Sequence, residues 1–135
     1  ATAGQPTAVV REEPAPPHDR RGGETILVVE DEDALRELVR LFLIRDGYQV
    51  LTAADGGEAL EVAASYAGTI DLLLTDLIMP LMLGPDLAER LSPLRPGLRV
   101  VYMSGGSLDE GDTLLRKPFS EQALLGLVRT VLDQA

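Results

Sequence analysis

This chain has no cysteine and no tryptophan, only 4% aromatic residues, and a single lysine, Lys117, among 12 basic residues. The absence of cysteine excludes disulfide bonds and thiolate metal sites. No apolar run is long enough to cross a bilayer, and the amino terminus lacks the charged and apolar regions of a secretory signal, so we expect a cytoplasmic domain without membrane contact. The net charge of -10 argues against a nucleic-acid partner, which needs clustered lysine and arginine.

The composition fits one folded domain preceded by a linker. The chain has 135 residues, of which 45% are hydrophobic and 25% charged, enough for a single core. Residues 1–24 hold four of the nine prolines and almost no apolar periodicity, so we predict a flexible linker there and a folded domain over residues 25–135. A linker implies a neighbouring domain, and we assign the linker no function of its own.

Short apolar segments alternate with helical patterns from Thr25 to the end of the chain. The predicted strands are Thr25 to Val29, Tyr48 to Ala53, the run that begins at Ile70, Arg99 to Ser104, and Thr113 to Leu115. Helical patterns follow the first, second, third and fifth of these strands. This alternation predicts an α/β fold, a doubly wound five-stranded parallel sheet, for which the flavodoxin-like strand order is 2-1-3-4-5.

The four helices are predicted from their end signals and their apolar spacing. Their start signals are Asp33, Asp55 with Glu58 as a capping-box-like pair, Gly84 with Pro85, and Ser120. Their stop signals, where the chain offers one, are Gly47, Gly68 and Pro96. Their buried faces are expected to carry Leu35, Leu38, Val39 and Phe42, then Leu60, Ala63, Ala64 and Ala67, then Leu87, Leu91 and Leu94, and last Leu124, Leu127, Val128 and Val131.

Polar side chains stand at the carboxyl ends of four predicted strands. Glu30 and Asp31 follow the first strand, Asp76 ends the third, Ser104 ends the fourth and Lys117 follows the fifth. An aspartate after a strand is often only a turn former. In the order 2-1-3-4-5, however, the first and third strands are neighbours at the switch point, so the three acids should converge. Carboxylates so near to one another repel and need a cation between them. Because the available ligands are all oxygen atoms, Mg²⁺ is the favoured cation.

The ordered set of these motifs resembles the receiver domains of bacterial two-component response regulators, over roughly Glu24 to the end. The segments that carry the resemblance are Ile-Leu-Val-Val-Glu30-Asp31-Glu, Leu-Leu-Thr-Asp76-Leu-Ile-Met-Pro80, Tyr-Met-Ser104-Gly and Arg-Lys117-Pro118-Phe. The resemblance implies that Asp76 accepts a phosphoryl group from a phosphohistidine, with self-phosphorylation and autodephosphorylation, rather than acting as a conventional enzyme.

The resemblance also implies roles for the surrounding residues. Asp31 and Asp76 would bind Mg²⁺ directly, together with the backbone carbonyl of Ile78, and Glu30 would act mainly through water. Ser104 would donate its hydroxyl to a phosphoryl oxygen, and Lys117 would pair with the phosphoryl charge, a role that suits a compact ammonium. The Lys117–Pro118 bond is a candidate cis peptide, as is usual in this family.

The chain departs from the family pattern at three places. Leu83 stands where the family usually has Asp, Asn or Ser, and Leu114 stands where it commonly has an aromatic switch residue. Only Gly105 to Asp112 remain for the crossover between strands four and five, whereas a parallel crossover normally takes a dozen or more residues. The usual fourth helix should therefore be absent or about one turn. An apolar edge left uncovered there invites association. We expect one of three outcomes: a self-contact that gives a homodimer through the edge formed by strands four and five, a partner helix on that edge, or a shift of the last helix to fill the gap.

The predicted linker at residues 1–24, and the end of the chain just after the last predicted helix, favour one interpretation of this domain. It would be the carboxyl-terminal receiver of a hybrid sensor histidine kinase. Its partners would be a histidine kinase or a histidine phosphotransfer protein. A stand-alone response regulator is one alternative, and a degenerate receiver that acts as an unphosphorylated interaction module is another. A Mg²⁺ phosphatase with an aspartyl intermediate would need a second aspartate at Ile78. A flavin-binding protein would need a hydroxyl-rich loop where this chain has acids.

Overall fold

The structure is a computed structural model that describes residues 23–105 and 114–134. Within these residues it has five strands and four helices. The strands are β1 (Thr25–Val29), β2 (Gln49–Ala53), β3 (Leu72–Asp76), β4 (Arg99–Ser104) and β5 (Leu114–Arg116). The helices are α2 (Asp33–Arg45), α3 (Gly56–Ser65), α4 (Gly84–Leu91) and α5 (Glu121–Leu132). The predicted linker, residues 1–24, lies almost wholly outside the described residues.

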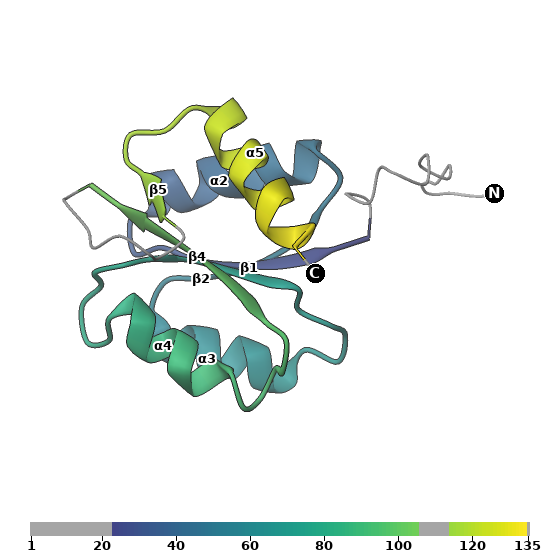
Figure 1. The fold of residues 1–135 in the computed structure, drawn as a ribbon. Coiled ribbons are helices and arrows are strands. Elements are labelled where there is room, and N and C mark those ends of the chain that lie inside the picture. The colour runs from purple at the N-terminus through teal and green to yellow at the C-terminus, as the bar shows by residue number, and fades with distance from the viewer. Residues whose placement is uncertain (1–22, 106–113, 135) are drawn as a thin grey trace.

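The five strands form one parallel sheet in the order β2-β1-β3-β4-β5, which confirms the predicted fold class and strand order. Helices α2 and α5 cover one face of the sheet, and α3 and α4 cover the other (Figure 1). Because every strand runs in the same direction, all the strand ends that precede a helix lie at one edge of the sheet. We call this the carboxyl edge.

The core consists of two apolar layers separated by the sheet. Successive residues of β1 point alternately into each layer: Ile26 and Val28 pack towards α2 and α5, whereas Leu27 and Val29 pack towards α3 and α4. All five residues of β1 are buried, as are all five of β3. The continuous apolar pattern of these two strands therefore reflects burial on both faces, which is typical of the centre of a parallel sheet.

The start signals of two helices are confirmed by hydrogen bonds. The Asp55 side chain accepts a bond from the Glu58 backbone N–H at 2.8 Å. The Glu58 side chain accepts one at 2.7 Å from the backbone N–H of Ala54, one residue before the cap position, so the start resembles a capping box. The Ser120 hydroxyl accepts a bond from the Ala123 N–H at 3.0 Å. Both helices thus begin where their cap residues stand.

Several details of the predicted helices were wrong. The residue before α2 is Glu32, so Asp33 lies in the first turn and does not cap it. Helix α3 ends at Ser65 rather than just before Gly68, because the backbone of Tyr66 is extended. The predicted buried side chains Leu38, Ala64, Ala67 and Leu94 are exposed.

Helical phase explains the error at Leu38. The buried face of α2 is centred on Val39 and Leu43. At about 100° per residue, Leu38 lies roughly 120° around the helix from that centre. A run of leucines satisfies more than one helical phase, and contact with the sheet selects between them.

Residues 106–113 of the crossover between β4 and β5 lie outside the described residues. The prediction that this crossover contains at most one helical turn therefore concerns residues that the structure does not describe. Strand β4 ends at Ser104, and the described part of the chain resumes with β5 at Leu114. The predicted first residue of this strand, Thr113, lies outside the described residues. On the face that α3 and α4 cover, Tyr102 pairs in register with Leu114. Both side chains are half-buried.

Candidate functional site

Three carboxylates meet at the carboxyl edge, as the sequence predicted. Glu30 and Asp31 follow β1, and Asp76 ends the neighbouring strand β3. One oxygen from each residue lies within 4.8 Å of the others. Glu30 is only 1% exposed and Asp76 8%, whereas Asp31 is exposed. The cluster is therefore rooted in the sheet and open to solvent on the side of Asp31.

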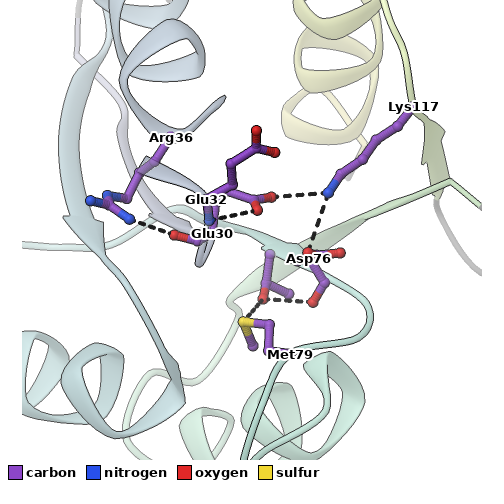
Figure 2. Close-up of polar contacts among 7 residues, drawn as sticks. Glu30, Glu32, Arg36, Asp76, Met79 and Lys117 are labelled. Atoms are coloured by element: carbon purple, nitrogen blue, oxygen red, sulfur yellow. Dashed lines mark hydrogen bonds and ion pairs between the residues drawn. The ribbon is translucent and has the colours of Figure 1, made fainter. Parts of the chain in front are cut away.

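Lys117 reaches this cluster from the exit of β5. Its ammonium contacts Glu30 Oε1 at 3.1 Å and Asp76 Oδ2 at 3.2 Å (Figure 2). Its backbone N–H donates to the carbonyl of Ser104 at 2.8 Å, which holds the lysine to the end of β4. The single lysine of the chain is thus the cation that links two of the three acids. The Lys117–Pro118 peptide bond is cis, as predicted.

Glu30 is held on both carboxylate oxygens. Oε1 accepts a hydrogen bond from the Lys117 ammonium, and Oε2 accepts one from the backbone N–H of Glu32 at 3.0 Å. Its own carbonyl accepts a bond from Arg36 at 2.7 Å, so α2 is tied to the end of β1 (Figure 2). Burial raises the pKa of Glu30, and the negative charge of Asp76 raises it further, while the bonds from Glu32 and Lys117 oppose both effects.

The same contacts act on Lys117 in the opposite sense. Burial alone would lower the pKa of the Lys117 ammonium, but its hydrogen bond to Glu30 and the charges of Glu30 and Asp76 outweigh burial and raise it. The lysine therefore stays protonated and serves as an internal counter-ion to the acids.

The position of Asp76 is set by the backbone around it. The N–H of Leu77 donates to the Met103 carbonyl at 2.8 Å, and the N–H of Gly84 donates to the Leu77 carbonyl at 2.8 Å. A Cβ at Gly84 would lie 2.6 Å from the carbonyl oxygen of Asp76, so only glycine allows the start of α4 to approach this closely. The Thr75 hydroxyl donates to the same Asp76 carbonyl at 3.0 Å. Asp76 thus stands on a rigid support.

Ser104 and Ile78 were also predicted to belong to the site. Ser104 ends β4, beside β3, and is buried. Ile78 follows Asp76 by two residues, and its side chain is 68% exposed. The roles of the Ser104 hydroxyl and of the Ile78 carbonyl stay predictions, as do those of the other residues in the site.

The residues present fit a Mg²⁺ ion. The donor set consists only of carboxylate oxygens, with no nitrogen or sulfur ligand in the cluster. Three carboxylates face one ammonium, which leaves a net negative charge that a divalent cation would balance. Mg²⁺ is commonly bound by one or two carboxylates while keeping several waters, and the exposed side at Asp31 leaves room for them.

A hollow of about 410 Å³ adjoins the site on the side of α2, and we call it the α2 groove. It is lined by Glu32, Leu35, Leu38, Lys117, Pro118 and Phe119. The sequence reasoning missed this surface because it assigned Leu38 to the core. The signal that could have found it is the density of leucine and isoleucine on α2, where Leu41 and Ile44 are also exposed. A helix that is apolar on more than one side has a second surface to cover.

Comparison with known proteins identifies the family. The model of the response regulator receiver domain matches residues 26–129. The chain belongs to this family. A receiver domain is a signalling domain of two-component systems, and it interacts with histidine kinases or phosphotransfer proteins.

Curated relatives include both sensor kinases and regulators. The sensor kinase CckA of Brucella abortus is 36% identical over 125 residues, which cover 86% of this chain and 13% of the kinase. The sensor kinase/phosphatase LuxN of Vibrio campbellii is 35% identical over 112 residues, with 80% and 13% covered. The probable transcriptional regulatory protein TcrX of Mycobacterium tuberculosis is 32% identical over 117 residues, with 80% and 49% covered. The chain thus spans half or less of these relatives.

Solved structures give the same result for the fold. The receiver domain of the hybrid histidine kinase CckA aligns with a TM-score of 0.73 and 43% identity, covering 81% of this chain and 99% of that one. The chemotaxis response regulator CheY4 of Vibrio cholerae aligns with a TM-score of 0.72 and 28% identity, covering 80% and 98%. Among the described residues, no helix is both long enough and apolar enough to span a membrane.

Proposed function

We propose that this domain accepts a phosphoryl group from a phosphohistidine onto Asp76, with Mg²⁺ as cofactor, as one step of a phosphorelay. The observation that carries the proposal is the position of the Asp76 carboxylate. It lies at the carboxyl end of a buried strand, beside two further carboxylates and 3.2 Å from the only lysine of the chain. A nucleophile, oxygen ligands for a metal and a fixed positive charge are the parts that phosphoryl transfer requires.

In this mechanism a carboxylate oxygen of Asp76 attacks the phosphorus atom. The new O–P bond forms as the N–P bond to the donor imidazole breaks, and the imidazole leaves as neutral histidine with a proton from solvent. Lys117 supplies positive charge beside the accepting carboxylate, and its compact ammonium suits a single phosphoryl oxygen. The Ser104 hydroxyl, at the end of the adjacent strand, is the proposed donor to a second oxygen.

Glu30, Asp31, Asp76 and the carbonyl of Ile78 are the groups that would hold Mg²⁺. The ion supplies charge neutralisation, since it lowers the repulsion between the acids and an incoming phosphoryl group. Asp31 is the accessible member, and Glu30 is already held by Lys117 and the Glu32 N–H. This difference supports a direct contact for Asp31 and a water-mediated one for Glu30.

Phosphorylation with a small donor tests the proposal. The wild-type domain is incubated with phosphoramidate and MgCl₂, and the acyl phosphate is located by mass spectrometry and by its lability to hydroxylamine. We expect a single phosphate on Asp76, and none in Asp76→Asn or after chelation of the metal. If Asp76→Asn still gains a hydroxylamine-labile phosphate, Asp76 is not the acceptor. If the wild-type domain gains none, the alternative of an unphosphorylated interaction module is favoured.

The α2 groove is the proposed contact for the protein that carries the phosphohistidine. It adjoins Lys117, and its apolar lining from Leu35, Leu38 and Phe119 suits the surface of another protein. Transfer from the autophosphorylated kinase cores of CckA and LuxN, each without its own receiver, tests whether a protein donor is used. The expected result is transfer from at least one of them to Asp76.

The cellular setting of the domain is also a proposal. The two sensor kinases among its relatives support a place in a cytoplasmic hybrid histidine kinase, and the match to TcrX keeps a response regulator as the alternative. The homodimer through the β4–β5 edge stays a prediction, which sedimentation of the purified domain with and without phosphoramidate tests. Signalling would then proceed by protein contact.

A further inference from the structure

The outward face of α2 carries an apolar stripe. Leu38 is 44% exposed, and Leu41 and Ile44 are each 43% exposed. They are three of the seven large apolar side chains that are exposed in the described part of the chain. We call these three residues the α2 stripe. Because they follow one another at intervals of three on one helix, they form a continuous surface.

The stripe lies on the side of α2 that faces away from the sheet. Helix α2 packs on the face of the sheet that it shares with α5 (Figure 1). Its buried face is centred on Val39 and Leu43. At about 100° per residue, Leu41 lies roughly 180° around the helix from that centre, and the other two stripe residues lie about 60° to either side of Leu41. The packing of α2 on its own sheet therefore does not account for these side chains.

Two charged side chains of opposite sign flank the stripe. Glu37 lies towards the start of α2 and Arg45 at its end, each about 40° around the helix from Leu41. The Glu37 side chain is 55% exposed and the Arg45 side chain 68%. Arg45 contacts Glu121 at 3.7 Å, and an ion pair this exposed is weak, so it leaves the guanidinium available to a second carboxylate.

The outward face of α2 is complementary to a second copy of itself. Where a two-fold axis passes beside Leu41, residues at equal distances before and after it face one another in the two copies. Leu38 then meets Ile44 of the second copy, and Glu37 meets Arg45 of the second copy, each pair occurring twice. In a parallel pair each of these charges would meet its own like charge and repel it. The charges therefore favour the antiparallel pair of helices.

The contact is small for a protein interface. Helix α2 has 13 residues and is therefore about 20 Å long. Stable complexes bury roughly 1,200 Å² or more in total, and a single pair of helices of this length buries less. The dimer should therefore be weak, with a dissociation constant on the order of 100 μM.

The α2 stripe overlaps the α2 groove. Leu38 belongs to both surfaces, since it also lines the groove. A second copy on the stripe would cover the groove at this side chain. Asp76 and Lys117 meet at the carboxyl edge of the sheet rather than on α2, so a small phosphoryl donor would still reach them.

We propose that the α2 stripe is the interface of an antiparallel homodimer, and that this dimer closes the α2 groove to a protein that carries a phosphohistidine. The first part is independent of the proposed function. The second part rests on it, since it assigns a regulation of the same site.

Sedimentation of the purified domain from about 10 μM to about 1 mM tests the first part. We expect the wild type to associate in this range. Leu41→Glu places two carboxylates at the two-fold axis and should raise the dissociation constant about 100-fold or more. Leu94→Glu is the matched control and should associate as the wild type does, because Leu94 is 53% exposed and follows α4, which covers the other face of the sheet.

Exchange of the flanking charges tests the antiparallel arrangement. Glu37→Arg and Arg45→Glu, made singly, bring like charges together in the dimer and should each weaken it about tenfold. The double variant Glu37→Arg, Arg45→Glu restores opposite charges and should return the dissociation constant to within about threefold of the wild type. Both residues are exposed, so these variants test the interface even if Leu41→Glu unfolds.

A disulfide at the axis tests the second part. The chain has no cysteine, so Leu41→Cys supplies one thiol per copy, and oxidised glutathione should join the two thiols across the axis, with Leu94→Cys as the control that stays unlinked. We expect the linked dimer to be phosphorylated by phosphoramidate at the rate of the reduced protein. Transfer from the kinase core that phosphorylates the wild type fastest should fall about tenfold or more and recover with dithiothreitol.

A wild-type domain that stays monomeric up to about 1 mM would overturn the proposal. So would association of Leu41→Glu as strong as that of the wild type, which would place the contact on another surface such as the β4–β5 edge. A double charge variant no better than the single ones would overturn the antiparallel pair, and equal transfer from the kinase to the linked and reduced proteins would overturn the closing of the groove. A wild-type domain that accepts phosphate from neither donor contradicts the proposed function instead, and sedimentation still decides the dimer.

Discussion

The substitution Lys117→Met tests how the acidic site is balanced. It removes the ammonium that lies 3.1 Å from Glu30 and 3.2 Å from Asp76 and leaves an apolar chain of similar length. At an effective dielectric near 20, each of these attractions is worth roughly 5 kcal/mol before desolvation. The carboxylate oxygens lie within 4.8 Å of one another, so each pair of charges repels by at least about 3.5 kcal/mol. The variant therefore loses the attraction and keeps the repulsion.

The net loss is much smaller than these gross terms. Breaking a buried ion pair costs about 3–5 kcal/mol. The Lys117 side chain is 24% exposed, so solvent screens part of its charge and the lower end applies. We expect the domain to lose about 3 kcal/mol, or roughly 12 °C in Tm for a domain near one hundred residues. Protonation of Glu30, whose pKa is already raised, would limit the loss.

Thermal unfolding with and without MgCl₂ supplies the assay. If Lys117 and the metal serve the same carboxylates, Mg²⁺ should raise the Tm of Lys117→Met more than that of the wild type, because no internal cation competes with it. Arg40→Met is the control, since it breaks an exposed pair with Glu37 and should behave as the wild type. Equal Mg²⁺ shifts in Lys117→Met and the wild type would refute the shared site.

Three further substitutions test the metal site, the backbone around Asp76 and the packing at the other edge of the sheet. Asp31→Ala should weaken Mg²⁺ binding by about tenfold or more in calorimetry without a loss of stability, because Asp31 is exposed; unchanged affinity would misplace the metal. Gly84→Ala should slow phosphorylation by phosphoramidate and lower the free energy of unfolding in urea by about 1–3 kcal/mol, because the new Cβ would lie 2.6 Å from the Asp76 carbonyl oxygen. Gly57→Ala is the control: its Cβ would have its nearest neighbour at 3.5 Å, so neither the rate nor the stability should fall. Arg95→Ala should cost about 2 kcal/mol, because its guanidinium donates to three carbonyls at the end of α3, and a Tm equal to the wild type would contradict this.

The sequence predicted the sheet and the acidic site well for a shared physical reason. Buried parallel strands are apolar on both faces, so β1 and β3 stand out without any knowledge of tertiary structure. Once the strands and their order are assigned, the carboxyl ends must lie together, and Glu30, Asp76 and Lys117 meet as expected. The site was predictable because topology alone brings these residues together.

Features that depend on side-chain direction were harder to predict. Leu38 and Ala64 fit the helical spacing and are exposed, because the spacing leaves the phase of the helix open until it packs. Arg95 shows the second difficulty. It binds Ala63, Tyr66 and Gly68 with bonds of 2.6–2.8 Å, and nothing in the spacing of these residues indicates the contact.

Side-chain caps are present on two helices and absent from the two helices that follow the acid-bearing strands. Helices α3 and α5, which follow the outer strands β2 and β5, have the side-chain caps Asp55 and Ser120. Helices α2 and α4, which follow the acid-bearing strands β1 and β3, have no side-chain cap bond.

At the start of α2, the N–H of Glu32 donates to the Glu30 carboxylate, so a backbone group near the helix end stabilises a residue of the site. At the start of α4, the cap position is Leu83, whose apolar side chain is 47% exposed and makes no cap bond. Both helix starts thus lack a side-chain cap at the edge where we propose that Mg²⁺ binds. Departures from local sequence preferences are expected at functional sites, and both of these lie beside the strands that carry Glu30 and Asp76.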